Sequence, residues 1–182
     1  MKQTLGKGAA VESAANVQAR LHLAAARLQG APGVRRAPAK ALPVLRDLAH
    51  EGSAEAAFLL GLAWLDGSVV SDPDPREAAG WLRRAARAGL PAAQCALGSL
   101  YREGIGIRKN RVKAFSLYEA AAGQGDVRAL YLLGRCCEEG IGCEPDERRA
   151  MRLYAAAARK GEPDAPSALE ELRRARRGKG RG

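Results

Sequence analysis

The chain has 182 residues, of which 47% are hydrophobic and only 4% aromatic, and its formal net charge at pH 7 is +10. This length suffices for one ordinary hydrophobic core, which alanine and leucine must pack because aromatic residues are scarce. Lys7, Glu12 and Arg20 interrupt the N-terminal region before an apolar stretch reaches the length of a signal peptide or a membrane span, so we expect a cytoplasmic protein without a membrane span. The same basic, acid-poor region faintly resembles an organelle transit peptide.

Glycines recur at a nearly constant spacing after the N-terminal region. Gly52, Gly89, Gly125 and Gly161 stand 37, 36 and 36 residues apart, and this period indicates one structural unit used several times. We expect an N-terminal extension, four units of which the first is degenerate, a capping helix and a tail. Their ranges are 1–16 for the extension, 17–52, 53–89, 90–125 and 126–161 for the units, 162–172 for the capping helix and 173–182 for the tail.

Each unit is predicted to contain two helices, because its apolar residues recur at helical spacing. In the second unit Ala57, Leu60, Gly61 and Trp64 form one apolar stripe. A second stripe follows it, formed by Ala78, Trp81, Leu82, Ala85 and Ala86. We expect small residues in slots such as that of Gly61 to let the two helices of a unit approach closely.

Glycines and capping residues mark where these helices begin and end. We expect Gly67, Gly104 and Gly140 to end the first helices in the left-handed conformation, which costs little only for glycine. The expected N-caps of the second helices are Asp74, Asn110 and Asp146. In the degenerate unit Ala37 occupies the cap slot, although Pro38 still marks a helix start.

The third unit carries the clearest pattern, and its fixed residues are Gly98, Tyr101, Gly104, Gly106, Ala121, Ala122 and Gly125. Together they resemble the Sel-one-like repeat, a relative of the tetratricopeptide repeat, and the resemblance extends over 53–161. It implies an all-α fold, a right-handed α-solenoid of tandem helix-turn-helix repeats, used as an adaptor that holds a partner protein and has no chemistry of its own. The second unit departs from the pattern at Ser68 and Val69 in its loop, and the fourth has Cys137 at the aromatic slot.

The resemblance also implies where a partner would bind, because the first helices of tetratricopeptide arrays line the concave side. The groove positions that follow from it are Glu55, Phe58, Leu62, Leu65, Ala92, Cys95, Ser99, Arg102, Arg128, Tyr131, Arg135 and Glu138. We expect a peptide whose apolar anchor meets the apolar positions of the second unit, while an acidic group reaches one of the arginines. Alternatively, Phe58 and Tyr131 only pack between first helices.

Few residues suggest chemistry. Cys136, Cys137 and Cys143 occupy slots that are apolar in other units, so we expect free thiols and no metal ion. The chain has two histidines, His22 and His50, and neither has a nucleophile suitably spaced, so we expect neither catalysis nor a cofactor.

The paired glycines Gly104 and Gly106 precede a helix, as the glycines of phosphate-binding loops do. They follow no strand and lack the Gly-Lys-Ser/Thr ending, so an inter-helix turn is the better prediction.

Positive charge is densest after the repeats, in a basic tail formed by Arg173, Arg174, Arg176, Arg177, Lys179 and Arg181. One interpretation is a solvated, disordered extension. The other is a salt-sensitive contact with nucleic acid, an anionic membrane or an acidic protein, which would be nonspecific because no aromatic residue is interleaved for stacking. Two functions therefore remain open: a monomeric protein-binding adaptor, or a nucleic-acid- or ribosome-associated protein that uses its basic flanks.

Overall fold

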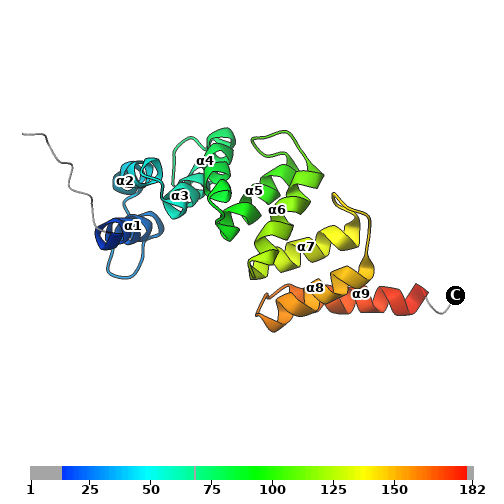
Figure 1. The fold of residues 1–182 in the computed structure, drawn as a ribbon. Helices are drawn as coiled ribbons and strands as arrows, with labels where there is room; N and C mark the ends of the chain where they lie inside the picture. Colours follow the sequence, from blue (N-terminus) through cyan, green and yellow to red (C-terminus); the bar gives the residue numbers. More distant parts are fainter. Residues whose placement is uncertain (1–13, 68, 180–182) are drawn as a thin grey trace, which may run out of the picture.

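The computed structural model describes residues 14–67 and 69–179, and within them the chain is entirely helical and without strands (Figure 1). The helices are α1 Ala14–Gln29, α2 Pro38–His50, α3 Ala54–Leu65, α4 Pro75–Arg87, α5 Pro91–Glu103, α6 Arg111–Gly123, α7 Val127–Glu139, α8 Glu147–Arg159 and α9 Ala165–Lys179. None of these described helices is both long and apolar enough to cross a membrane.

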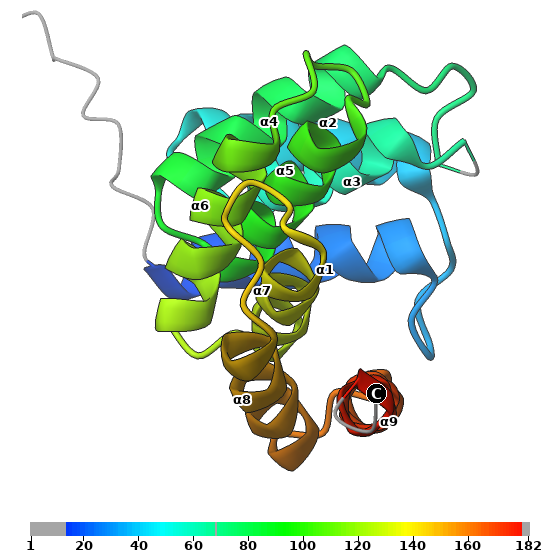
Figure 2. The same ribbon diagram turned by 90° about the vertical axis from the view of Figure 1, so that its right-hand side faces the viewer.

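Four helical hairpins, α1–α2, α3–α4, α5–α6 and α7–α8, stack in chain order, and α9 packs on α8 at the end. Figures 1 and 2 show them following one another along an arch instead of surrounding one centre. First helices also contact each other, α1 with α3 and α5 with α7, whereas the described second helices make no comparable contacts. The predicted all-α solenoid is thus confirmed, with the first helices as its more closely packed layer.

Side-chain caps start the second helices as the sequence predicted. The carboxylate of Asp74 accepts from the backbone N–H groups of Arg76 and Glu77 at the start of α4. Asn110 and Asp146 accept in the same way at the starts of α6 and α8. Because the first backbone N–H groups of a helix lack partners within it, each cap fixes the residue at which its helix begins.

The ends of the first helices agree with the prediction in two units and differ in one. Gly104 and Gly140 follow α5 and α7 with φ of 82° and 67°, the left-handed conformation expected of them. The prediction for Gly67 is wrong, because α3 ends at Leu65 and Asp66 leaves the helix in an extended conformation. The loop of this unit is one residue longer, so the chain leaves the helix earlier and needs no left-handed glycine there.

In three hairpins, α3–α4, α5–α6 and α7–α8, a glycine of the first helix faces a large side chain of the second. A Cβ atom placed on Gly98 would lie 2.7 Å from Cε1 of Tyr118, and one on Gly61 would lie 2.6 Å from Cγ of Leu82. Tyr118 and Leu82 are both fully buried. The predicted close approach at the Gly61 slot is therefore confirmed, and the absent side chain makes room for a core residue.

In the loops before α6 and α8, a second glycine lies against the backbone of the preceding hairpin. A Cβ atom on Gly106 would lie 2.1 Å from the carbonyl oxygen of Pro75, and one on Gly142 would lie 2.2 Å from that of Arg111. Pro75 and Arg111 are the first residues of α4 and α6. The loop before each of α6 and α8 thus rests directly on the backbone at the start of the preceding second helix.

Both ends of the array differ from the predicted boundaries. Helix α1 begins at Ala14, inside the predicted extension, and the remainder of that extension lies outside the described residues. The disorder predicted from residue 173 is wrong for 173–179, because α9 continues to Lys179. Leu169 and Leu172 are buried and anchor this helix, while Arg176 reaches Glu147 of α8. Arg181 lies outside the described residues.

Candidate protein-binding groove

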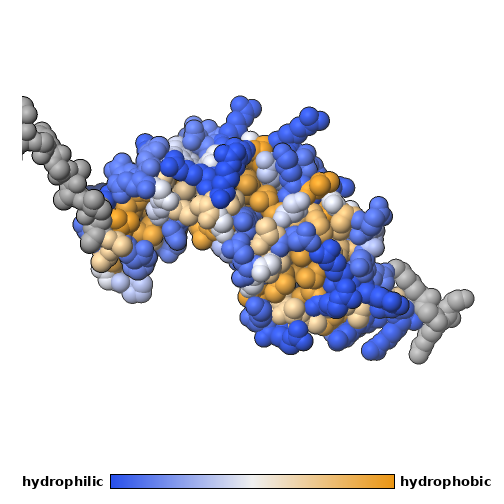
Figure 3. Space-filling model, viewed as in Figure 1, coloured by the Kyte–Doolittle hydropathy of each residue, from blue (hydrophilic) through white to orange (hydrophobic). Residues whose placement is uncertain are grey.

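The apolar positions predicted for the groove lie on α3, and the structure exposes them unequally. Leu62 is 38% exposed, one of the most exposed large hydrophobic residues described. Phe58 and Leu65 are half-buried against the core, and Glu55 is exposed. Figure 3 shows apolar surface in two areas of this face, one over the α1–α3 half and the other over α6–α8. Leu62 is therefore the apolar groove residue best placed to contact a partner.

A pocket of about 580 Å³ opens beside Leu62, between α1, α3 and the loops that follow them. Its lining is mainly apolar and consists of Leu28, Gln29, Arg36, Leu59, Leu62, Ala63, Asp66 and Val69. Asp66 and Arg36 lie at its polar edge, where Arg36 Nε donates to the carbonyl oxygen of Leu28 at 3.3 Å. A single apolar side chain of a partner would fit such a cavity.

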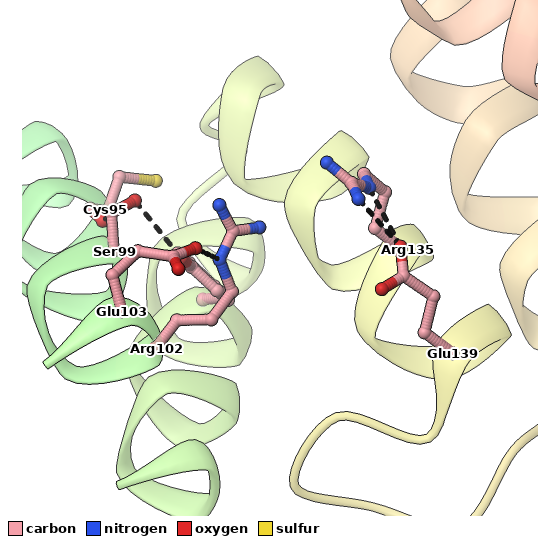
Figure 4. A network of polar contacts seen from close by, with 7 residues as sticks. Cys95, Ser99, Arg102, Glu103, Arg135 and Glu139 are labelled. Carbon is pink, nitrogen blue, oxygen red and sulfur yellow. Dashed lines mark hydrogen bonds and ion pairs between the residues drawn. The ribbon is translucent and has the colours of Figure 1, made fainter. Parts of the chain in front are cut away.

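Two of the predicted cationic positions converge farther along the array. Arg102 of α5 and Arg135 of α7 line a common pocket of about 370 Å³ (Figure 4). Each is already paired, Arg102 Nε with Glu103 Oε1 at 2.7 Å and Arg135 Nη2 with Glu139 Oε1 at 2.7 Å. The hydrogen bond with Glu139 also holds the pKa of Arg135 above its ordinary value. Its lining also contains Lys109 and Arg111, so four cations face the two carboxylates and the pocket is polar and net cationic.

Arg128, the third predicted cation, does not join the other two. Its Nη1 atom donates to Glu162 Oε1 and, at 3.0 Å, to Asp164 Oδ2, both in the turn between α8 and α9. These hydrogen bonds, with that to Asp164 the stronger influence, raise the pKa of Arg128. The guanidinium also lies 5.1 Å from the ring centre of Tyr131. Arg128 thus fastens the turn that leads into α9 to α7, a role that the sequence analysis did not anticipate.

The remaining polar groove residues, Ser99 and Glu138, form hydrogen bonds with buried tyrosines of the second helices. Tyr154, which is fully buried, donates its hydroxyl to Glu138 Oε2 at 2.6 Å, and burial together with this bond raises the pKa of the tyrosine. The Tyr118 hydroxyl lies 3.1 Å from Ser99 Oγ. The Tyr131 ring packs against that of Tyr154 at 5.7 Å. The one sequence signal for these bonds was a tyrosine in the second helix opposite Gly98 and opposite Gly134.

The predicted change from apolar to cationic along the groove stays a prediction, to which the structure adds the partners of each charged residue. Its apolar end exists, as the pocket beside Leu62. At its other end each of the three arginines is paired with a carboxylate of Glu103, Glu139, Glu162 or Asp164. Lys109 and Arg111 keep the pocket of Arg102 and Arg135 net cationic. Pairs of this kind depend on how successive units dock, which spacing alone does not reveal.

The cysteines lie in the apolar slots, as predicted, and all four are free thiols. Cys136 and Cys137 are fully buried, and burial raises the pKa of their thiols to about 12 and about 11. Cys95 was predicted to face the groove, but it is only 7% exposed and its Sγ donates to Asp126 Oδ1 at 3.5 Å. Within the described part of the chain, no three metal-ligating side chains gather as a metal site would require.

Comparison with known proteins gives matches to one family. The sequence model of the Sel1 repeat matches 54–90, 91–126 and 127–162, each range beginning one residue after the unit boundary predicted above. The chitin synthase regulator SKT5 of Saccharomyces cerevisiae is 43% identical over 79 residues, which are 42% of this chain and 11% of that protein.

Two solved structures share the fold over 86% of this chain. A Sel1 repeat protein from Oxalobacter formigenes has a TM-score of 0.75 and 33% identity, and the match covers 63% of its length. The protective antigen c5321 of uropathogenic Escherichia coli, described as displaying an SLR fold, has a TM-score of 0.78 and 29% identity over 33% of its length. The chain thus spans less than two thirds of each of these relatives.

Proposed function

The chain belongs to the Sel1 repeat family, and from this premise we propose that it is a non-catalytic scaffold that holds a segment of a partner protein along its first helices. Sel1 repeat proteins are in general protein-interaction scaffolds or adaptors. The observation that carries the proposal is the apolar pocket of about 580 Å³ between α1 and α3, with Leu62 exposed at its edge.

An apolar anchor of the partner would enter this pocket, where it removes Leu62, Leu59 and Val69 from water. Burying one large aliphatic or aromatic side chain contributes about 1.5–3 kcal/mol. An acidic group farther along the segment would bind Arg102 or Arg135. A guanidinium has five N–H donors, so the bonds to Glu103 and Glu139 leave each arginine able to hold a second carboxylate.

The test compares two substitutions of equal chemistry at exposed hydrophobic residues. Leu62→Asp places a charge at the pocket, whereas Val112→Asp places one on α6, where Val112 is 63% exposed. In-cell crosslinking with mass spectrometry on the full chain should lose its specific partner with Leu62→Asp and keep it with Val112→Asp. Equal partner capture by both variants would show that the groove is not the binding surface.

We further propose that the scaffold works as a monomer in the cytoplasm. The four free thiols support a reducing compartment, since secreted proteins usually pair their cysteines. Sedimentation of the full chain at several concentrations tests the first point, and imaging of the tagged protein in its native cell tests the second.

A second candidate function, association with nucleic acid or ribosomes, rests on the exposed arginines of α9. Arg174 and Arg177 are exposed on this helix, and no ion pair holds either of them among the described residues. Counterion release from nucleic acid would make such binding fall steeply with salt. A salt titration of the full chain and of Arg174→Ala/Arg177→Ala against a double-stranded oligonucleotide separates the two functions, because groove binding should depend little on salt.

A further inference from the structure

A second cavity, of about 540 Å³, lies between α4 and the loop that leads from α5 into α6, and it shares Lys109 with the pocket of Arg102 and Arg135. It is lined by Arg83, Tyr101, Ile107, Arg108, Lys109, Asn110 and Lys113. Four of these side chains are cations and none is an acid. Figure 3 shows hydrophilic side chains projecting from the molecule above α4 and this loop.

No described acidic side chain lines this cavity, although Lys109 also borders the pocket that contains Glu103 and Glu139. None of Arg83, Arg108, Lys109 and Lys113 forms an ion pair within the described chain, whereas the arginines of the groove are all paired. Lys113 Nζ lies 5.5 Å from the ring centre of Tyr101, which holds the ammonium at the wall of the cavity. Like charges gathered this closely repel one another, so an anion in the cavity would be stabilising.

We call the region between the second helices of consecutive units a junction. At the next junction, between α6 and α8, the two corresponding positions carry opposite charges and form an ion pair. Counting 36 residues onward from Arg83 and Lys113 leads to Glu119 and Arg149. Arg149 Nη2 and Glu119 Oε1 form an ion pair at 2.6 Å that joins α6 to α8. At the junction with the cavity the same two positions are both cationic, so the contact that neutralises the next junction is impossible.

The other cations of the cavity are also particular to this junction. Arg108 and Lys109 correspond to Glu144 and Pro145 one unit later. One unit earlier, the positions of Arg83 and Lys113 hold Arg46 and Glu77, which again carry opposite charges. The junction between α4 and α6 thus has a cavity lined by four cations. At the junctions before and after it, the positions of Arg83 and Lys113 hold residues of opposite charge.

We propose that this cavity binds a phosphate monoester group. Such a group carries a charge of about −1.5 to −2 at pH 7 and has three acceptor oxygens, so it neutralises more of the four cations than one carboxylate does. The planar guanidinium groups of Arg83 and Arg108 can each donate two parallel hydrogen bonds to it, and Lys109 and Lys113 add ammonium donors. The site is formed by α4, α5, α6 and the loop from α5 into α6. It shares only Lys109 with the groove pockets, so it does not depend on the groove function.

The binding test uses the full chain labelled with ¹⁵N and titrated at constant ionic strength. The probes are O-phosphoserine, inorganic phosphate and acetate, which separate a phosphate monoester from free phosphate and from a carboxylate. We expect saturable shifts of the backbone amides of 107–113 with O-phosphoserine, and none that saturate with acetate. Saturation by inorganic phosphate alone, or equally by acetate, would overturn the assignment of a monoester site.

The matched variants are Arg83→Glu and Arg148→Glu, which change the net charge by the same amount. Arg83→Glu restores beside Lys113 the opposite charges of the next junction, and it should weaken O-phosphoserine binding about tenfold or more. Arg148 is exposed on α8, outside the cavity, and its variant should bind within about twofold of the unaltered chain. Equal weakening by both variants would mean general electrostatic attraction, and it would refute the site.

Lys113→Glu provides a second reversal of charge at the cavity if Arg83→Glu fails to fold. It reproduces the pair Arg46 and Glu77 of the first junction, and it should weaken O-phosphoserine binding to a similar extent. Unchanged binding in a folded Lys113→Glu variant would also refute the site.

Discussion

Single glycines determine how close the two helices lie in the hairpins α3–α4, α5–α6 and α7–α8. Gly98→Ala should lower the free energy of unfolding by about 1–3 kcal/mol, because the new Cβ would lie 2.7 Å from the buried Tyr118 ring. Gly80→Ala, inside α4 with open space around it, should instead raise stability by about 0.5–1 kcal/mol. Urea denaturation measures both, and equal effects would mean that helix propensity and not crowding governs these positions.

Buried thiols give the fold a dependence on alkaline pH. The thiols of Cys136 and Cys137 have an ordinary pKa of 9.0, which folding raises to about 12 and about 11. Between pH 9 and 11 the unfolded chain therefore binds fewer protons than the folded one, so stability falls as the pH rises. At pH 10 we expect each thiol to account for a loss of about 1 kcal/mol.

Comparing urea denaturation at pH 8 and pH 10 isolates this contribution. The Cys136→Ala/Cys137→Ala variant should be less stable at pH 8, because alanine leaves a cavity, yet it should lose less stability than the unaltered chain on going to pH 10. If the two proteins lost the same amount, lysines and tyrosines would be the titrating groups.

For single residues, the sequence predicted the place of a side chain in its helix better than the residue with which that side chain forms an ion pair. The apolar slots of the cysteines and the cap at Asp74 depend on local register, which a repeat displays directly. The pair Arg135–Glu139 is four residues apart on one helix and was also within reach of inference. Arg128 and Glu162 are separated by 34 residues, so their contact depends on how the next unit docks.

The turn before α9 is held to α7 by the hydrogen bonds of Arg128, which one substitution can remove. Arg128→Ala should lower the free energy of unfolding by about 2 kcal/mol, because the side chain of Glu162 is only 8% exposed and would be left without its partner. Arg135→Ala serves as the comparison, since Glu139 is 43% exposed, and it should lose less than about 1 kcal/mol. Thermal denaturation ranks the two variants, and the reverse order would contradict this account of α9.

The ends of helices were predictable where capping residues mark them. They were less predictable where the end of a helix depends on how it packs against its neighbours. The dense arginines after residue 172 suggested disorder, yet Arg173 pairs with Glu170 and Arg176 with Glu147, so part of that charge is offset within the helical stack. The end of α3 differed from prediction because one extra loop residue changed the path of the chain.

Over the described residues the molecule is a stack in which each hairpin packs mainly on its neighbours, and its stability should vary along the chain accordingly. Native-state hydrogen exchange in low urea should show the greatest protection in α3 to α6, whose hairpins have another hairpin on both sides, and less in α1 and α9. Identical opening free energies in all helices would instead mean that the array unfolds as a single cooperative unit.

Overall architecture was the most predictable level, because a period of 36 or 37 residues already indicates tandem units. The cationic cavity between α4 and α6 was not anticipated. Its residues come from separate units, and each one alone is an ordinary exposed side chain. Only the docking of consecutive hairpins brings Arg83 near Lys113.

The loops at Gly106 and Gly142 touch the preceding helix through main-chain atoms, and this has a consequence for how such an array can diverge. The loop contributes only glycine to this contact, so the surrounding side chains can change without altering how the loop and the helix pack together. We call this main-chain contact the joint. Arg83 and Glu119 illustrate this freedom, since one position carries opposite charges in consecutive units while both units keep the same joint. New specificities can therefore accumulate on the surface while the architecture that presents them is preserved.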